Sequence, residues 1–214
     1  MGGYQLELVS EFLDLGILLD PQLNFKKHIT MIINKSRGVL AFIKRWSKEF
    51  NEPLITKRLY TSLVRPILEY GSIIWDPNMA YLKNNIESVQ KQFLLFCLGN
   101  STWNPNINLS PYTTRLSIIK LPTLESRRKM LNVAFLINLI NGSVCSDFLL
   151  GHITFSISWR FTRNFIPLYL QIFHNSYANA DPFRKLCIDF NNFYNLVDFS
   201  TNVNQIKRYN IVFK

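Results

Sequence analysis

The residues with the clearest chemical use are the lysines and arginines between residues 25 and 65. That stretch holds ten cations against two acids, Glu49 and Glu52, and so carries a net charge of +8. Contacts from Lys and Arg to phosphates supply most sequence-independent affinity for nucleic acid. The pattern favours a phosphate-binding surface, although a plainly solvated basic face fits the same count. The cations are Lys26, Lys27, Lys35, Arg37, Lys44, Arg45, Lys48, Lys57, Arg58 and Arg65.

Residue types that bind metals or perform catalysis are scattered along the chain. The histidines and cysteines form no HExxH and no CxxC, and no GxSxG, P-loop or GxGxxG is present. Asp14 and Asp20 lie six residues apart, but a strand edge and a helix cap explain them better than a cation site. The sequence therefore assigns no catalytic residue, no metal ligand and no cofactor to this chain. The scattered residues are His28, His152, His174, Cys97, Cys145 and Cys187.

The composition is that of a folded, basic protein. Of 214 residues, 48% are hydrophobic and 14% aromatic, which is more apolar material than disordered chains carry. The net charge of +10 favours a polyanionic partner. No signal-peptide pattern opens the chain, and no uncharged apolar run reaches the roughly 18 residues of a membrane helix. We therefore expect an intracellular protein, nuclear or cytoplasmic, that has no membrane partner.

Residues 4–20 are expected to form a β-hairpin. Ser10 and Glu11 would supply its turn, and Phe12–Leu19, including Gly16, would be its second strand. That strand places apolar residues on both faces, so it expects cover on both sides. Without such cover we expect residues 1–20 to be disordered or prone to aggregate.

Two long helices should follow the hairpin and carry the cations. Residues 25–48 repeat apolar side chains at steps of three and four, while Arg37, Lys44 and Lys48 fall within about 60° of one another on another face. Asn24 is the expected N-cap. The next helix, at about 52–75, contains Pro66, which predicts a kink or break near Ser62.

Further helices complete a mainly α fold: a short N-terminal β-hairpin, a helical bundle, an irregular aromatic-rich segment and a C-terminal helix. We expect three parts, a hairpin at 1–20, a helical domain at 21–99 and a C-terminal helical region at 110–214. A polar connection at 99–109 separates the last two. The further helices are expected at 79–97, 111–119, 122–141 and 182–199, with a single turn at 145–150 and an irregular segment at 154–180.

Four aromatic residues near the cations have two possible roles. Trp46, Tyr60, Tyr70 and Trp75 could stack on bases or sugars. They could also fill the core between the helices. Trp46 and Tyr70 lie on the apolar stripes, so we expect these two in the core.

Several segments together resemble one family of proteins. Residues 13–29 read LDLGILLDPQLNFKKHI, similar to the DLGvxlDxxLxFxxHI stretch that follows the palm of jockey-like non-LTR retrotransposon reverse transcriptases. Residues 59–77, LYTSLVRPILEYGSIIWDP, give the tightest match. Residues 37–45, RGVLAFIKR, residues 86–93, IESVQKQF, and residues 121–128, LPTLESRR, continue it. The set covers essentially the whole chain and thins after about residue 150.

The resemblance implies roles for particular residues. The hairpin would correspond to the end of the palm, near the primer grip, and the helices after it to the thumb that closes on the template–primer duplex. The residues implied near the primer terminus are Leu15, Gly16 and Ile17. The implied thumb-side phosphate contacts are Lys27, Arg37, Lys44, Lys48 and Arg65.

The same resemblance implies a truncated RNA-directed DNA polymerase. The family's catalytic aspartates and its fingers lie upstream of the part matched here, so no polymerisation by this chain alone is expected. The implied partners are an RNA/DNA duplex and the missing palm and fingers, and the complete polymerase would need Mg²⁺. Two alternatives remain: a helical protein-interaction module whose helices at 25–48 and 52–75 form a groove, or a remnant of an element with no function.

Overall fold

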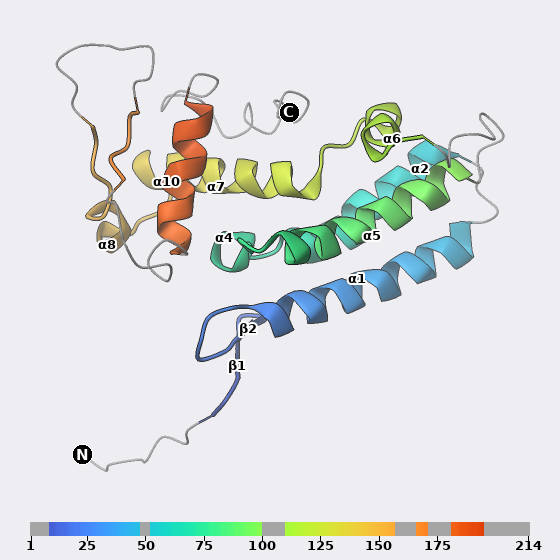
Figure 1. The fold of residues 1–214 in the computed structure, drawn as a ribbon, viewed down its shortest axis with the longest axis horizontal. Helices are drawn as coiled ribbons and strands as arrows, with labels where there is room; N and C mark the ends of the chain where they lie inside the picture. Colours follow the sequence, from blue (N-terminus) through green and yellow to red (C-terminus); the bar gives the residue numbers. More distant parts are fainter. Residues whose placement is uncertain (1–8, 48–51, 100–109, 157–165, 171–180, 195–214) are drawn as a thin grey trace.

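The computed structural model describes residues 9–47, 52–99, 110–156, 166–170 and 181–194. These residues form a mainly helical fold that opens with a two-stranded antiparallel hairpin, which confirms the predicted fold class. Figure 1 shows the hairpin at one end of a layer of long helices formed by residues 26–99. A second group of helices, within residues 124–193, lies on the side of that layer away from the helix at 26–46.

The hairpin pairs strand β1 (Phe12–Asp14) with strand β2 (Ile17–Leu19). The prediction of a turn at Ser10–Glu11 is wrong. Both strands of the hairpin lie within residues 12–19, which were expected to form a single strand. Leu15 and Gly16 form the turn, with φ angles of 46° and 83°. Positive φ at both central positions is the requirement of a type I′ hairpin turn, and glycine adopts it without steric cost.

Helix α1 (Lys26–Trp46) follows a loop organised by one carboxylate. Asp20 accepts hydrogen bonds from the backbone N–H groups of Gln22 at 2.9 Å, Asn24 at 3.3 Å and Phe25 at 3.2 Å. Asn24 then accepts from the N–H of Lys26 at 3.0 Å. The N-cap itself is Phe25, with a φ of 54°, so the prediction of Asn24 as the N-cap is wrong by one residue. The buried stripe of α1 contains Ile29, Ile32, Ile33, Ser36, Leu40 and Ile43.

The second long helical segment is interrupted where the sequence predicted. Helix α2 (Pro53–Leu59) passes into the π-helical turn η2 (Tyr60–Val64) and then into α3 (Arg65–Glu69). Pro66 has no N–H to donate to the preceding turn, and the wider turn accommodates that loss. Gly71, with a φ of 62°, ends this run and precedes the short helix α4 (Ser72–Trp75).

Helix α5 (Ala80–Gly99) completes the helical layer. It runs parallel to α1, while the α2–η2–α3 segment runs antiparallel to both (Figure 1). Their apolar side chains form one core with Ile17 of the hairpin. Helix α6 (Tyr112–Ile119) adds Leu116 and Ile119 to that core.

Helix α7 (Leu124–Ile140) links this core to a second one. Its Leu124 belongs to the first core, while Met130 and Val133 belong to the second. Helix α10 (Pro182–Phe193) crosses α7 and supplies the other side of the second core (Figure 1). The short helix α8 (Asp147–Leu150) lies at the end of α7, and the expected division between residues 99 and 110 stays a prediction.

Ion pairs with little or no exposure to solvent fasten α7 and α10 to the helical layer. The Arg128 side chain is 0% exposed, and its Nε donates to Oδ1 of Asp76. The other carboxylate oxygen of Asp76 pairs with Lys185 of α10. Arg127 donates two hydrogen bonds to Glu69 of α3, one of them from Nη2 to Oε2 at 2.8 Å. Each charge needs its partner, because an unpaired buried charge is costly.

Substituting Asp76→Asn should therefore destabilise the protein strongly. The change keeps the side-chain shape but leaves the buried guanidinium of Arg128 without a counter-charge, a loss of about 3–5 kcal/mol. Urea denaturation would measure the free energy of unfolding. The matched control is Glu125→Gln, because Glu125 pairs with Lys83 and Lys129 near the surface and should cost about 1 kcal/mol or less. Equal losses in the two variants would contradict this ranking.

Candidate nucleic-acid interface

The outward face of α1 carries six cations and no acid. Five of the cations are exposed, and Lys44 is half-buried. The helix turns these residues outward because the apolar stripe occupies its opposite face. The six are Lys26, Lys27, Lys35, Arg37, Lys44 and Arg45.

Three of these cations form a row along the edge of α1 that faces α5. Lys26, Arg37 and Lys44 fall within about 20° of one another at 100° per residue and span about 27 Å at 1.5 Å per residue. Arg37 Nη2 donates to the hydroxyl of Ser88 at 3.2 Å. Lys44 Nζ lies 5.7 Å from the centroid of the Phe96 ring. We define these three residues as the cationic row. Its length matches about eight base pairs of duplex at 3.4 Å per step.

Helix α5 adds no exposed acid beside the cationic row. Its one carboxylate, Glu87, is buried and turned toward α6 and α7. Glu87 accepts from the N–H of Leu124 at 3.2 and 3.1 Å and from the hydroxyl of Tyr112. Burial and this carboxylate raise the pKa of Tyr112, so its hydroxyl stays a donor. The positive potential of α1 is therefore not neutralised from α5.

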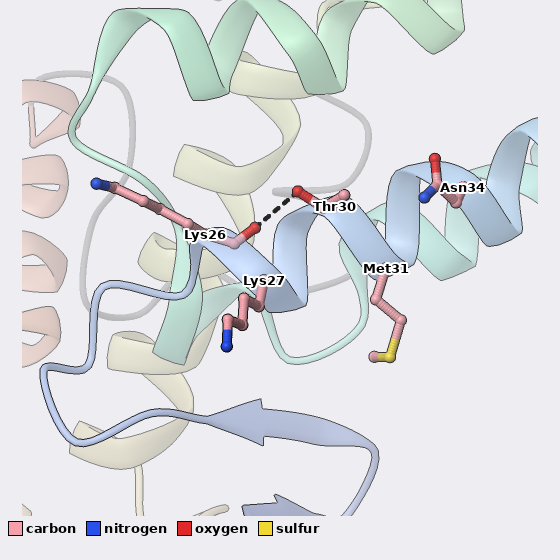
Figure 2. Close-up of a pocket in the computed structure, with 5 residues that line it drawn as sticks. All are labelled: Lys26, Lys27, Thr30, Met31 and Asn34. Atoms are coloured by element: carbon pink, nitrogen blue, oxygen red, sulfur yellow. Dashed lines mark hydrogen bonds between the residues drawn. The ribbon is translucent and has the colours of Figure 1, made fainter. Parts of the chain in front are cut away.

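Lys27 lies apart from the cationic row, on the side of α1 nearer the hairpin. Figure 2 shows Lys26 and Lys27 pointing to different sides of the helix. They line an open depression of about 360 Å³ together with Thr30, Met31 and Asn34. Lys27 pairs with Glu11, and the hydrogen bond to this carboxylate raises the pKa of Lys27. Its side chain is still 69% exposed, so a phosphate can reach it.

Arg65 lies where α3 contacts α7, and it is not part of the cationic row. Its Nε lies 3.6 Å from Oε1 of Glu69, the carboxylate that Arg127 also binds. Burial, and then the charge of Arg127, lowers the pKa of Arg65. Its assignment as a phosphate contact stays a prediction. Lys48, the remaining residue of that predicted set, lies outside the described residues.

The predicted primer-grip residues sit where the hairpin docks on the α3–α4 junction. The hydroxyl of Tyr70 donates to the carbonyl of Leu15 at 2.9 Å, and the Leu15 side chain is 82% exposed. Ile17 is buried against Gly71, where a Cβ would meet its side chain at 2.6 Å. The arrangement holds Gly16 at the tip of a supported turn, with Leu15 facing solvent.

His28 of α1 supports the same hairpin through a hydrogen bond to β2. Its Nδ1 accepts a hydrogen bond from the N–H of Leu18 at 3.2 Å, which requires the neutral ring. The ring meets Trp75 edge-on, with centroids 5.5 Å apart. Burial lowers the pKa of His28. This buried histidine is therefore a structural support for the turn.

Two aromatic expectations are wrong. Trp46 and Tyr70, expected in the core, are 68% and 60% exposed. Tyr60 and Trp75 are buried instead. Tyr60 stacks on Phe93 with centroids 4.0 Å apart, and its hydroxyl donates to Gln90 at 2.9 Å.

The described residues contain neither a metal cluster nor a membrane span. No group of three or more His, Cys, Asp or Glu side chains among them is arranged to hold a metal ion. Within the same residues, no helix combines the length and apolarity needed to cross a bilayer.

Comparison with known proteins gives one distant relative. The chain is 27% identical over 129 residues to an uncharacterized protein of Caenorhabditis elegans, B0403.1. The match covers 60% of this chain and 63% of that protein, so the chain spans less than two thirds of the relative's length. No family model matches the chain. No solved structure matches it either.

The role of His28 predicts a specific pH dependence of stability. The folded pKa lies below the ordinary value of 6.5, so the unfolded chain takes up a proton on His28 before the folded chain does. The stability from neutral His28 is present above about pH 6.5 and is lost as the pH falls toward the folded pKa. The variant His28→Asn keeps an acceptor near the N–H of Leu18 and does not titrate. Between about pH 7.5 and pH 5.5, the wild type should lose more unfolding free energy than this variant in urea melts. A constant difference between the two proteins would contradict the assignment.

Proposed function

We propose that this chain is the thumb-like part of a jockey-like non-LTR retrotransposon reverse transcriptase and grips an RNA/DNA template–primer duplex. The observation that carries the proposal is the outward face of α1, which displays six cations and no acid beside a helix whose own acid is buried. Such a face attracts a polyanion, and of its six cations Lys27 is paired with a carboxylate, that of Glu11.

The geometry supports binding to a duplex backbone without reading its sequence. The cationic row is straight over about 27 Å, as a rigid helix dictates, and so suits regularly repeated phosphates. Arg37 and Lys44 are each held by α5, through Ser88 and Phe96, which restricts their motion before binding. Their positions therefore favour a backbone contact of fixed register over base recognition.

In this proposal the chain positions nucleic acid and performs no chemistry. Phosphoryl transfer would belong to the aspartates and Mg²⁺ ions of the palm in the complete polymerase. The docked hairpin turn at Leu15–Ile17 would face the primer terminus, supported by Tyr70 and His28. The duplex would then lie along α1 from the hairpin end toward Trp46.

A helical protein-interaction module is the second candidate. Exposed apolar side chains on α2 and η2, namely Leu54, Ile55 and Leu63, favour it, since exposed apolar clusters mark partner surfaces. Under that function, removal of charge from α1 would leave partner binding nearly intact.

The proposal predicts salt-dependent binding that depends on the cationic row. The double variant Arg37→Gln/Lys44→Gln should weaken binding to a blunt RNA/DNA hybrid. It should also reduce the slope of log affinity against log salt by about 1.4–1.8, since each lost phosphate contact removes roughly 0.7–0.9. Fluorescence anisotropy over a series of salt concentrations would measure both quantities.

The matched control for this experiment is Lys120→Gln. Lys120 is exposed at the end of α6, away from α1, so its loss should leave the slope unchanged. An affinity of the wild type that does not change with salt would overturn the proposal. Equal effects of the α1 variant and the control would do the same.

A further inference from the structure

An exposed aromatic pair stands on the last two turns of α1. The rings of Phe42 and Trp46 have centroids 5.9 Å apart at an angle of 45°. Phe42 is 49% exposed, and Trp46 is the more exposed of the two. Leaving rings of this size in water forgoes much of their burial energy, so a ligand that covers them would gain it.

The surroundings of the pair are positive. Arg45 precedes Trp46 in the chain, and Lys35 lies two turns before Phe42 on the same edge of the helix. Helix α1 has no acid anywhere along its length. Charge complementarity therefore selects an anionic occupant.

Residues with small side chains leave open space beside the two rings. Gly38 and Ala41 are exposed on the same helix face, and a Cβ on Gly38 would meet nothing within 4 Å. A nucleic-acid strand can cross the helix at Gly38 and Ala41, between the aromatic pair and the cationic row. Phosphates would then meet Lys44 and Arg45 while a base covers Trp46.

We infer that Phe42 and Trp46 form a stacking platform for the unpaired bases of single-stranded nucleic acid. The inference deepens the proposed function and rests on it, because it names the single-stranded continuation of the duplex as the ligand of the Trp46 end of α1. Aromatic side chains interleaved with cations bind single strands without sequence preference, since every base offers a ring face.

A membrane surface suits the same residues less well. An interfacial helix needs a continuous apolar face, but the two rings are flanked by Lys35, Gly38, Ala41 and Arg45. Stacking requires only one open ring face and a nearby cation, and both are present.

The test compares three ligands: a blunt RNA/DNA hybrid, the same hybrid with a single-stranded tail, and the single strand alone. With the full chain, Trp46→Leu should lose about five- to 140-fold in affinity for the two ligands that have unpaired bases, the range of one lost base stack. Its affinity for the blunt hybrid and its salt slope should not change, because no phosphate contact is removed. Trp46→Phe, which keeps a ring, should retain most of the binding.

The control variant is Tyr169→Leu, which removes another exposed aromatic ring far along the chain and should change none of the three affinities. Equal binding of the tailed hybrid by wild type and Trp46→Leu would overturn the inference. An equal loss on blunt and tailed hybrids would also overturn it. Binding to phosphatidylserine vesicles that depends on Trp46, with tail binding unchanged, would assign the rings to lipid instead.

The outcomes also separate the inference from the proposed function. In one outcome the wild type binds the blunt hybrid and Trp46→Leu changes the affinity for none of the ligands. That outcome would support the proposed duplex binding and contradict the stacking platform. Binding of the single strand through Trp46 without binding of the blunt hybrid would keep the platform and remove the duplex grip.

Discussion

The buried carboxylate of Asp76 fixes how α7 and α10 are joined to the layer of long helices. It receives Arg128 from α7 and Lys185 from α10, so one residue at the end of α4 joins three helices. Asp189 of α10 lies nearby, where burial raises its pKa while the amide of Asn132, which donates to it at 2.7 Å, opposes that rise. Interactions of this kind tolerate little displacement, because separated charges would lose their partners in a poorly solvated interior.

Contacts of the same kind join sequence segments that are far apart in the chain. Glu69 and Asp76 belong to segment 59–77, and Arg127 and Arg128 belong to segment 121–128. Gln90, in segment 86–93, accepts from Tyr60 and donates to the carbonyl of Pro122 at 2.8 Å. Several charged and amide side chains in these segments are therefore used internally, whereas the cations of α1 face solvent.

The periodic features of the sequence predicted the helices well, because an apolar stripe of adequate length specifies a helix with little help from distant residues. The bounds of α1, α5, α6 and α7 lie within a few residues of the expected ranges. The kink near Ser62 was also predictable, since the loss of the N–H at Pro66 is a local effect. The hairpin turn was misplaced because Leu15, a residue that seldom adopts positive φ, occupies one of its two central positions.

The aromatic and charge assignments needed the tertiary structure. The π-turn at Tyr60–Val64 adds a residue to the helical repeat, so a stripe drawn at a constant 100° no longer describes the residues after it. Tyr70 lies beyond that turn, and Trp46 lies on the final turn of α1, so neither reached the core that simple periodicity assigned to it. Arg65 and Glu69 are four residues apart on α3, a spacing that local pattern reveals. The binding of the same carboxylate by Arg127, on a helix about sixty residues away, is a contact that local pattern cannot reveal.

Chemical footprinting of lysines would test most directly whether α1 is the surface that meets nucleic acid. Acetylation of the full chain, with and without bound RNA/DNA hybrid, would be measured by mass spectrometry at each lysine. Strong protection of Lys26 and Lys44, with little change at Lys83, Lys120 and Lys129, is the predicted result. Protection concentrated at those last three lysines, with Lys26 and Lys44 still reactive in the complex, would contradict it.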